Sequence, residues 1–209
     1  MIRVFIADDH AIVRHGLRQL VSNCHDMTVV GEACDGHEML RAAESGTWDV
    51  LVLDLALPRL SGLEALRRIR AQKPKLPVVI LSMFPEDQYA VRLLREGAAA
   101  YLSKDRPGEE VLAAIRKVAQ GGTYVTESVA EQVIRSPRSA EKLPHEMLTG
   151  REYQIFTLIT HGKTVSEIAA ELDLTAGTVS GHLAKVKEKL GARSVADVVS
   201  YAHRTGLID

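Results

Sequence analysis

Five short apolar runs, each followed by a segment of helical periodicity, constrain the fold of this chain more than any other feature. A continuous apolar run of this length predicts a strand that is buried on both faces. Regular alternation of such strands with helices predicts an α/β domain: a doubly wound, five-stranded (βα)5 parallel sheet with helices on both faces. The predicted strands are residues 2–7, 28–30, 50–53, 78–81 and 99–102.

Polar side chains follow four of these predicted strands. Asp8 and Asp9 come after the first, Asp54 after the third, Ser82 after the fourth and Lys104 after the fifth. The carboxyl ends of parallel strands share one edge of the sheet, so these side chains should converge there. Three carboxylates, a hydroxyl and an ammonium suit a divalent cation and a phosphoryl group. Taken individually, each of these residues could instead be a solvated loop residue or a helix cap.

The composition is that of an ordinary globular protein, with 46% hydrophobic and 25% charged residues among 209. The formal net charge of −1 gives no general attraction to nucleic acid, so any such binding must depend on a local patch. No apolar run approaches the ~20 residues of a membrane span, and residues 1–4 lack a signal-peptide layout. Cys24 and Cys34 lack metal-ligand spacing, which favours reduced thiols and a cytoplasmic location.

The pattern changes after residue 121, where the strands stop. Residues 122–143 are polar, and we interpret them as a linker with a short helix over 127–135. Residues 144–209 then predict a small all-α domain, in which two capping boxes precede apolar helical faces at Thr149 and Thr164. Only a short turn separates its two middle helices, which is the spacing of a helix-turn-helix.

The third helix of this domain, predicted over 175–190, carries the local positive charge. Lysines and one arginine near its end can neutralise phosphates, whereas the small residues near its start permit close approach to a DNA backbone. Two glycines inside the helix each cost ~1 kcal/mol and have no evident structural reason. The alternative is a solvated, lysine-rich face of a small bundle. The residues concerned are Thr175, Gly177, Thr178, Ser180, Gly181, His182, Lys185, Lys187, Lys189 and Arg193.

Residues 1–121 resemble the receiver domain of two-component response regulators. The resemblance rests on Asp8-Asp9, on the motif that begins Asp54-Leu55-Ala56-Leu57-Pro58, on Ser82, and on Tyr101-Leu102-Ser103-Lys104. It implies that Asp54 is the phosphoacceptor. It further implies Mg²⁺ (or Mn²⁺) held by Asp8, Asp9, Asp54 and the Ala56 carbonyl, with Asp8 acting partly through water. Ser82 and Lys104 would contact the phosphoryl group, and Tyr101 would be the aromatic switch; the alternative for Tyr101 is a partly exposed strand aromatic.

Residues 144–209 resemble the LuxR-type helix-turn-helix. The motifs are Leu148-Thr149-Gly150-Arg151-Glu152, Ser166-Glu167-Ile168-Ala169, Thr178-Val179-Ser180-Gly181-His182-Leu183 and Lys189-Leu190-Gly191. The resemblance implies that the helix over 175–190 enters the major groove of DNA, with Val179, Leu183 and Leu190 in the core. The side of the helix facing DNA would carry Thr175, Thr178, Ser180, Gly181, His182, Lys185, Lys187 and Lys189, although His182 could equally pack.

Both halves together resemble a NarL/FixJ-family response regulator. This implies a cytoplasmic transcription regulator, not an enzyme beyond its own phosphotransfer and dephosphorylation, with no membrane contact. Its partners would be a sensor histidine kinase, double-stranded DNA and, on activation, a second copy of the chain. One alternative is a phosphorylation-independent receiver with constitutive DNA binding. Another is a flavin- or nucleotide-binding enzyme, against which Asp8-Asp9-His10 stands where a glycine-rich loop would be needed.

Overall fold

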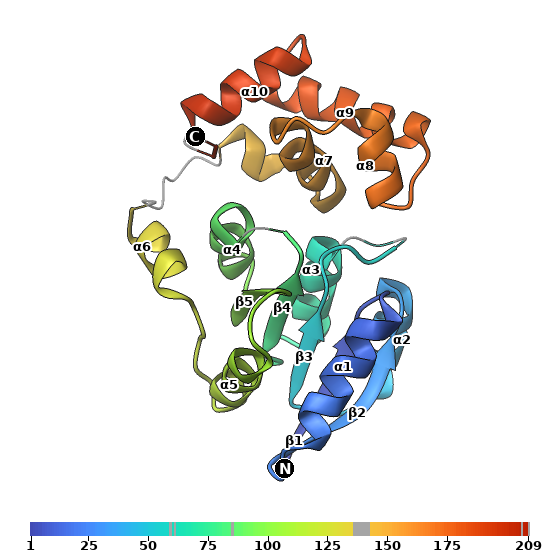
Figure 1. Cartoon of the computed structure of the whole chain (residues 1–209), viewed down its shortest axis with the longest axis vertical. Coiled ribbons are helices and arrows are strands. Elements are labelled where there is room, and N and C mark those ends of the chain that lie inside the picture. The colour runs from blue at the N-terminus through green and yellow to red at the C-terminus, as the bar shows by residue number, and fades with distance from the viewer. Residues whose placement is uncertain (59, 61, 85, 136–142, 206, 209) are drawn as a thin grey trace. The chain divides into compact units, whose positions relative to one another are not determined.

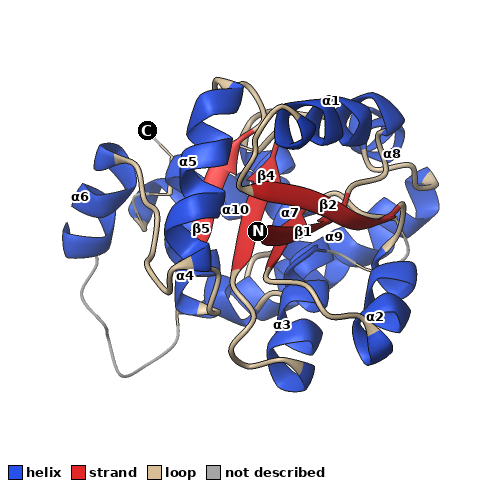
Figure 2. Ribbon diagram, turned by 90° about the horizontal axis from the view of Figure 1, so that it is seen from below, coloured by secondary structure: helices blue, strands red, loops and turns tan. Residues whose placement is uncertain are grey.

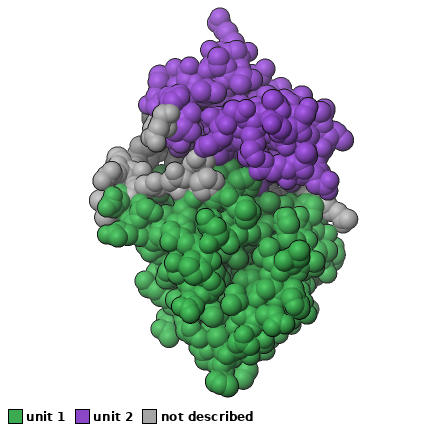
Figure 3. Space-filling model, in the orientation of Figure 1, with its two compact units in different colours: residues 1–137 green, residues 138–209 purple. Residues whose placement is uncertain are grey.

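The computed structural model describes residues 1–209 except 59, 61, 85, 136–142, 206 and 209. The chain divides into two compact units, residues 1–137 and 138–209 (Figure 3). Pro85, predicted as the start of a helix, and residues 136–142 of the predicted linker lie outside the described residues. Within the described part of the chain, no helix has both the length and the apolar character needed to cross a bilayer.

The first unit is built on one five-stranded sheet (Figure 1). All its strands pair in parallel, in the order β2-β1-β3-β4-β5, which confirms the predicted doubly wound architecture. The strands are β1 (Ile2–Ala7), β2 (Met27–Ala33), β3 (Val50–Leu53), β4 (Val78–Ser82) and β5 (Ala100–Ser103).

A helix follows each strand. Figure 2 shows α1 and α5 on one face of the sheet and α2, α3 and α4 on the other. Because both faces are covered, every residue of β3 and β4 is buried, and all of them except Ser82 are apolar. The helices are α1 (Ala11–Ser22), α2 (Gly36–Ser45), α3 (Gly62–Gln72), α4 (Glu86–Arg95) and α5 (Gly108–Ala119).

Strand β2 is longer than the sequence predicted. It covers Met27–Ala33 rather than 28–30, because Gly31 and Glu32 interrupt the apolar run without interrupting the backbone pairing with β1. The register shifts between Val4 and Phe5, and the β2 residue skipped by the shift, Val30, is exposed. This irregularity lies on the edge of the sheet, where bulges are common.

The segment after α5 stays with the first unit. Tyr124 forms an isolated parallel bridge with Ala100 of β5, and helix α6 (Glu127–Arg135), present where a short helix was predicted, contacts α4. The Thr126 hydroxyl donates a hydrogen bond of 2.9 Å to Oε2 of Glu86, which is 9% exposed. The same carboxylate accepts two bonds from the Arg106 guanidinium, both 3.1 Å long, and one of 3.2 Å from the Ser103 backbone N–H. Glu86 therefore ties together α4, the end of β5 and the start of α6.

The second unit is helical in all its described elements. A 3₁₀ turn, η1 (Pro144–Met147), which the sequence did not predict, precedes α7 (Gly150–Thr160), α8 (Val165–Glu171), α9 (Ala176–Leu190) and α10 (Val195–Arg204). Both predicted capping boxes, at Thr149 and Thr164, are present, and Ser194 forms a third at the start of α10. Asp173 turns the chain between α8 and α9 with a φ of 50°, a left-handed conformation that aspartate tolerates.

We expect Thr126→Val to loosen α6 while leaving the sheet unit intact. The substitution keeps the side-chain volume but removes the hydroxyl that donates to Glu86, at a cost of about 1 kcal/mol. Amide hydrogen exchange over residues 127–135 should therefore accelerate about fivefold to tenfold, with the amides of β3 and β4 unchanged. Ser128→Ala is the matched control, since the Ser128 hydroxyl lies 3.2 Å from that of Thr126, whereas the bond to Glu86 comes from Thr126. Equal acceleration in both variants would contradict the role given to Glu86.

Candidate functional site

The carboxyl edge of the sheet brings together the polar residues that the sequence singled out. Asp8 follows β1, Asp54 follows β3, Ser82 ends β4 and Lys104 follows β5. Their backbones are fixed by the sheet itself: the Asp54 N–H donates to the Ala7 carbonyl at 2.8 Å, and the Lys104 N–H donates to the Ser82 carbonyl at 2.8 Å.

The Lys104 ammonium lies between two buried carboxylates. Its Nζ is 2.6 Å from Asp8 Oδ2 and 2.9 Å from Asp54 Oδ2, and the three side chains are 5%, 3% and 1% exposed. Burial raises the pKa of Asp54 above its ordinary value; Lys104 opposes this effect and the charge of Asp8 adds to it. Burial alone would lower the pKa of Lys104, but the two carboxylates outweigh burial and raise it. A charged Lys104 beside an Asp54 of raised pKa is the result.

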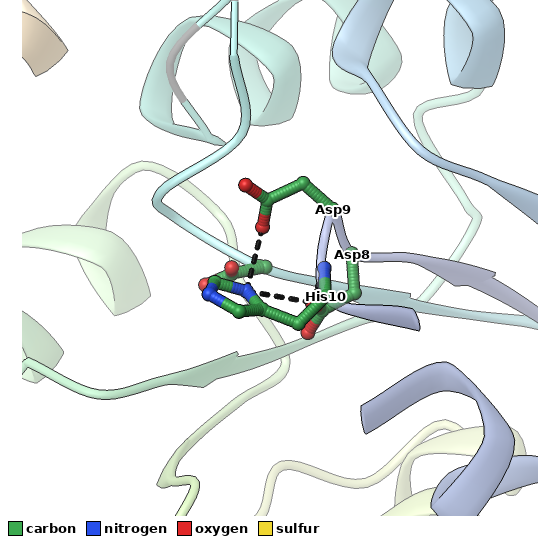
Figure 4. Close-up of side chains that lie close together, drawn as sticks. Asp8, Asp9 and His10 are labelled. Atoms are coloured by element: carbon green, nitrogen blue, oxygen red, sulfur yellow. Dashed lines mark hydrogen bonds and ion pairs between the residues drawn. The ribbon is translucent and has the colours of Figure 1, made fainter. Parts of the chain in front are cut away.

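Asp9 and His10, which follow Asp8 in the loop after β1, lie beside these buried carboxylates. His10 Nδ1 is 2.7 Å from Asp9 Oδ1 and 3.3 Å from Asp8 Oδ1, so its ring lies against both carboxylates (Figure 4). The ligand atoms of Asp8, Asp9, His10 and Asp54 all lie within 4.8 Å of one another. Such a set is chemically suited to a divalent cation, since hard cations take carboxylate oxygens. The Ala56 N–H donates to Asp54 Oδ1 at 3.2 Å, which places that loop beside the same site.

Ser82 and Tyr101 are connected through the loop after β4. The Phe84 N–H donates to Ser82 Oγ at 3.2 Å, and the Tyr101 hydroxyl donates to the Phe84 carbonyl at 2.8 Å. Tyr101 is 1% exposed, so the alternative of a partly exposed strand aromatic was wrong. Burial raises the pKa of Tyr101 well above its ordinary value, so the hydroxyl stays protonated and acts as the donor.

In the second unit, helix α9 presents the polar residues of its first turns to solvent. Thr175 caps the helix by accepting a bond of 3.1 Å from the Thr178 N–H, and Ser180, Gly181 and Lys185 are exposed. A Cβ added at Gly181 would meet nothing within 4 Å, so internal packing does not require this glycine. The opposite side of the helix is core, with Val179 at 0% and Leu183 at 7% exposure, although Leu190 is only partly buried.

Lys189 differs from the other lysines of α9. Its Nζ lies 2.6 Å from Oε2 of Glu152, a residue of α7 that is only 3% exposed. Burial alone would raise the pKa of Glu152, but the bonds from Lys189 and Thr149 outweigh burial and lower it. Lys189 therefore holds α9 against α7 through a largely buried carboxylate, so this member of the predicted DNA-facing set has an evident structural role, as the capping residue Thr175 does.

His182 lies between the exposed polar side of α9 and its buried side. It is partly buried, and burial, together with the charge of Lys185, lowers its pKa below the ordinary value. Sequence reasoning left open whether His182 contacts phosphate or packs; its partial burial is compatible with both.

Two residues near the sheet edge were not assigned roles from the sequence. His10 directly follows Asp8 and Asp9 in the sequence, and this position was the one indication that its ring could lie at the acidic site. Glu86 had no such signal, because its partners Arg106 and Thr126 lie 20 and 40 residues away.

Comparison with known proteins identifies both units. A model of the response regulator receiver domain matches residues 4–116, and a model of bacterial regulatory proteins of the luxR family matches residues 146–202. Response regulator UvrY of Escherichia coli K12 is 34% identical over 209 residues, with 99% of this chain and 96% of UvrY covered. Transcriptional regulatory protein LiaR of Bacillus subtilis is 36% identical over the full length of both chains. A structure of RcsB from Salmonella enterica serovar Typhimurium, bound to promoter P1flhDC with phosphomimetic BeF₃⁻, covers 96% of this chain and 97% of that one, with a TM-score of 0.62 and 25% identity.

We expect Asp54→Asn to raise the free energy of unfolding of the first unit at pH 7 by about 1 to 2 kcal/mol. The amide removes a buried charge and leaves Lys104 neutralised by Asp8. Since the pKa of Asp54 is raised in the folded state, ionisation of Asp54 costs stability as the pH rises above about 4, the ordinary aspartate range. The gain should therefore be present at pH 7 and vanish near pH 4. Urea unfolding across this range measures it, with the partly exposed Asp9→Asn as control; a gain that is independent of pH would contradict this account.

We expect Lys189→Met to destabilise the second unit by about 1 to 2 kcal/mol, because Glu152 would remain buried without its cation while solvent screens part of the loss. Since the pKa of Glu152 is lowered in the folded state, the ion pair stabilises above the ordinary glutamate pKa and is lost as the pH falls through the folded value. The difference from wild type should therefore shrink in acid. Amide exchange in α7 and α9 measures the effect. The exposed Lys185→Met should leave both helices unchanged, and an equal effect of the two substitutions would refute the structural role of Lys189.

Proposed function

The chain belongs to the response regulators that join a receiver domain to a luxR-family regulatory domain, and we propose that phosphorylation of Asp54 controls its binding to DNA. The observation that carries this proposal is the position of Asp54. Its buried carboxylate follows the central strand, touches the Lys104 ammonium and lies beside the other acids of the sheet edge. We assign residues 1–121 to the receiver domain, 122–143 to the linker and 144–209 to the DNA-binding domain.

The phosphoryl transfer that we propose uses the residues of the edge in distinct roles. An Asp54 carboxylate oxygen forms a bond to phosphorus as the bond between phosphorus and the leaving group of the donor breaks. Lys104, already 2.9 Å from Asp54, neutralises a phosphoryl oxygen as a compact cation. The Ser82 hydroxyl donates to another phosphoryl oxygen.

A bound Mg²⁺ (or Mn²⁺) would neutralise charge on the transferring phosphoryl group. Asp8, Asp9 and Asp54 offer the carboxylates for it, and we assign the Ala56 carbonyl to the same set. The donor set supports this assignment, because three carboxylates with ligand atoms within 4.8 Å of one another carry more negative charge than the Lys104 ammonium alone can balance.

The switch that we propose runs through the loop after β4. Movement of Ser82 toward a phosphoryl oxygen would break the bond that its Oγ accepts from the Phe84 N–H. The Phe84 carbonyl also accepts the Tyr101 hydroxyl, so the loop and Tyr101 would rearrange together. A local change of charge would thereby bias a two-state element of the fold.

The output that we propose is DNA binding by α9. Thr175, Thr178, Ser180, Gly181, His182, Lys185 and Lys187 would lie toward the major groove, with Lys189 contributing through its hold on Glu152. Gly181 supports close approach, because its exposed helix position has no packing requirement.

Solved structures of the related fold include one described as an RcsB–DNA complex and one described as two RcsB dimers on two DNAs. For this chain, we propose a dimer on activation, a sensor histidine kinase as phosphodonor and the cytoplasm as location.

The test is chemical and genomic. Acetyl phosphate with Mg²⁺ should add ~80 Da to the wild type as an acid-stable, base-labile group, and nothing to Asp54→Asn. A genome-wide map of bound DNA should then lose most of its sites in the Asp54→Asn strain. If the wild type gains no mass, or the Asp54→Asn variant gains as much, Asp54 is not the phosphoacceptor. If DNA occupancy is unchanged in the variant, the regulator acts independently of phosphorylation.

A further inference from the structure

The ring of His10 makes the acidic edge a mixed nitrogen and oxygen site. His10 is the residue that precedes α1, in the N-cap position, yet its side chain makes no capping hydrogen bond. The ring lies instead against the acids of the same loop, with Nδ1 2.7 Å from Asp9 Oδ1 and 3.3 Å from Asp8 Oδ1 (Figure 4). It occupies the same cluster as the Asp54 carboxylate.

These separations match neighbouring ligands of one metal ion. Two adjacent ligands at ~2.1 Å from an octahedral ion lie about 3.0 Å apart, and opposite ligands lie about 4.2 Å apart. The measured distances of 2.7 and 3.3 Å bracket the first value, and all four ligand atoms fall within 4.8 Å. Only small movements of the His10 and Asp9 side chains, which are 58% and 33% exposed, would be needed to admit an ion between them.

The carboxylate of Asp8 is already divided between two partners. Its Oδ2 contacts Lys104 at 2.6 Å, whereas its Oδ1 accepts the His10 backbone N–H at 2.8 Å and faces the His10 ring. The oxygen that faces His10 is therefore the one on the side of the proposed metal. The backbone bond holds the main chain of His10 beside this oxygen, so the ring lies within reach of the site before an ion binds.

We propose that His10 coordinates the metal of the receiver site through Nδ1, and that the site consequently prefers first-row transition ions over Mg²⁺. This inference rests on the proposed function, because it concerns the ion that assists phosphorylation of Asp54. Imidazole nitrogen suits Co²⁺, Ni²⁺ and Zn²⁺ better than Mg²⁺, and the affinity of a mixed nitrogen and oxygen site rises from Mn²⁺ through Co²⁺ to Ni²⁺. A set of carboxylates without His10 would discriminate less among these ions.

The test compares metals on the full-length protein by calorimetry, using Mg²⁺, Mn²⁺, Co²⁺ and Ni²⁺ alone. In His10→Asn the affinity for Mg²⁺ should change less than about twofold, while the loss should grow along the transition series and reach at least about tenfold for Ni²⁺. The chain has eight histidines, so Asp9→Asn identifies the heat that belongs to this site. His15→Asn is the matched control, because His15 lies one turn further along α1 and outside the cluster.

Pulsed EPR of the Mn²⁺-loaded protein gives a second readout. A ¹⁴N coupling from a directly bound imidazole should appear in the wild type and in His15→Asn, and disappear in His10→Asn. Equal losses for all four metals, or no nitrogen coupling in the wild type, would overturn the role of His10. If Mg²⁺ still binds and Asp54 is still phosphorylated, only this inference has failed; if no divalent ion binds the wild type, the metal site of the proposed function has failed with it.

Discussion

Two carboxylates and one ammonium group, all nearly excluded from water, meet at the carboxyl edge of the sheet. Asp8, Asp54 and Lys104 come from three strands that are not consecutive in the sequence, so their contact exists only when the sheet is fully assembled. One lysine cannot balance two ionised carboxylates, and burial makes the remaining negative charge costly. The site therefore gains from an added cation, and chemical modification of Asp54 would change the balance of charge around Lys104.

The same edge is connected to the start of α6 by hydrogen bonds. Ser82 and Tyr101 both bond to the backbone of Phe84, and two residues later Glu86 accepts bonds from Arg106 and Thr126. In the sequence, a single residue separates Phe84 from Glu86, so the two groups of hydrogen bonds are close together along the chain. On the proposed function, this chain of contacts is a physical route from the phosphoryl group to the segment that leads toward the DNA-binding unit.

The sequence predicted those features that depend on local patterns. Apolar runs and capping residues gave the strands and helices, and the rule that parallel strands share one edge brought Asp8, Asp54, Ser82 and Lys104 together. It did not predict the contacts between side chains distant in sequence. The spacing of Lys185, Lys187 and Lys189 indicates a basic helix end, but only the packing of α7 shows that Lys189 is paired with Glu152, 37 residues away. The length of strand β2 was underestimated, because its backbone pairing with β1 continues through Gly31 and Glu32, where the apolar pattern stops.

The bridge between Tyr124 and Ala100 has a consequence for behaviour in solution. The outer strands of an open sheet present backbone groups to which other chains can add, and this is a route to aggregation. On the β5 side, the segment around Tyr124 occupies part of that edge, with its N–H donating to the Ala99 carbonyl at 2.9 Å. On the β2 side, the register shift at Val30 interrupts the regular ladder. A receiver domain shortened to end before Tyr124 would leave the backbone groups of the β5 edge unpaired. It should therefore precipitate more readily than a version that includes α6.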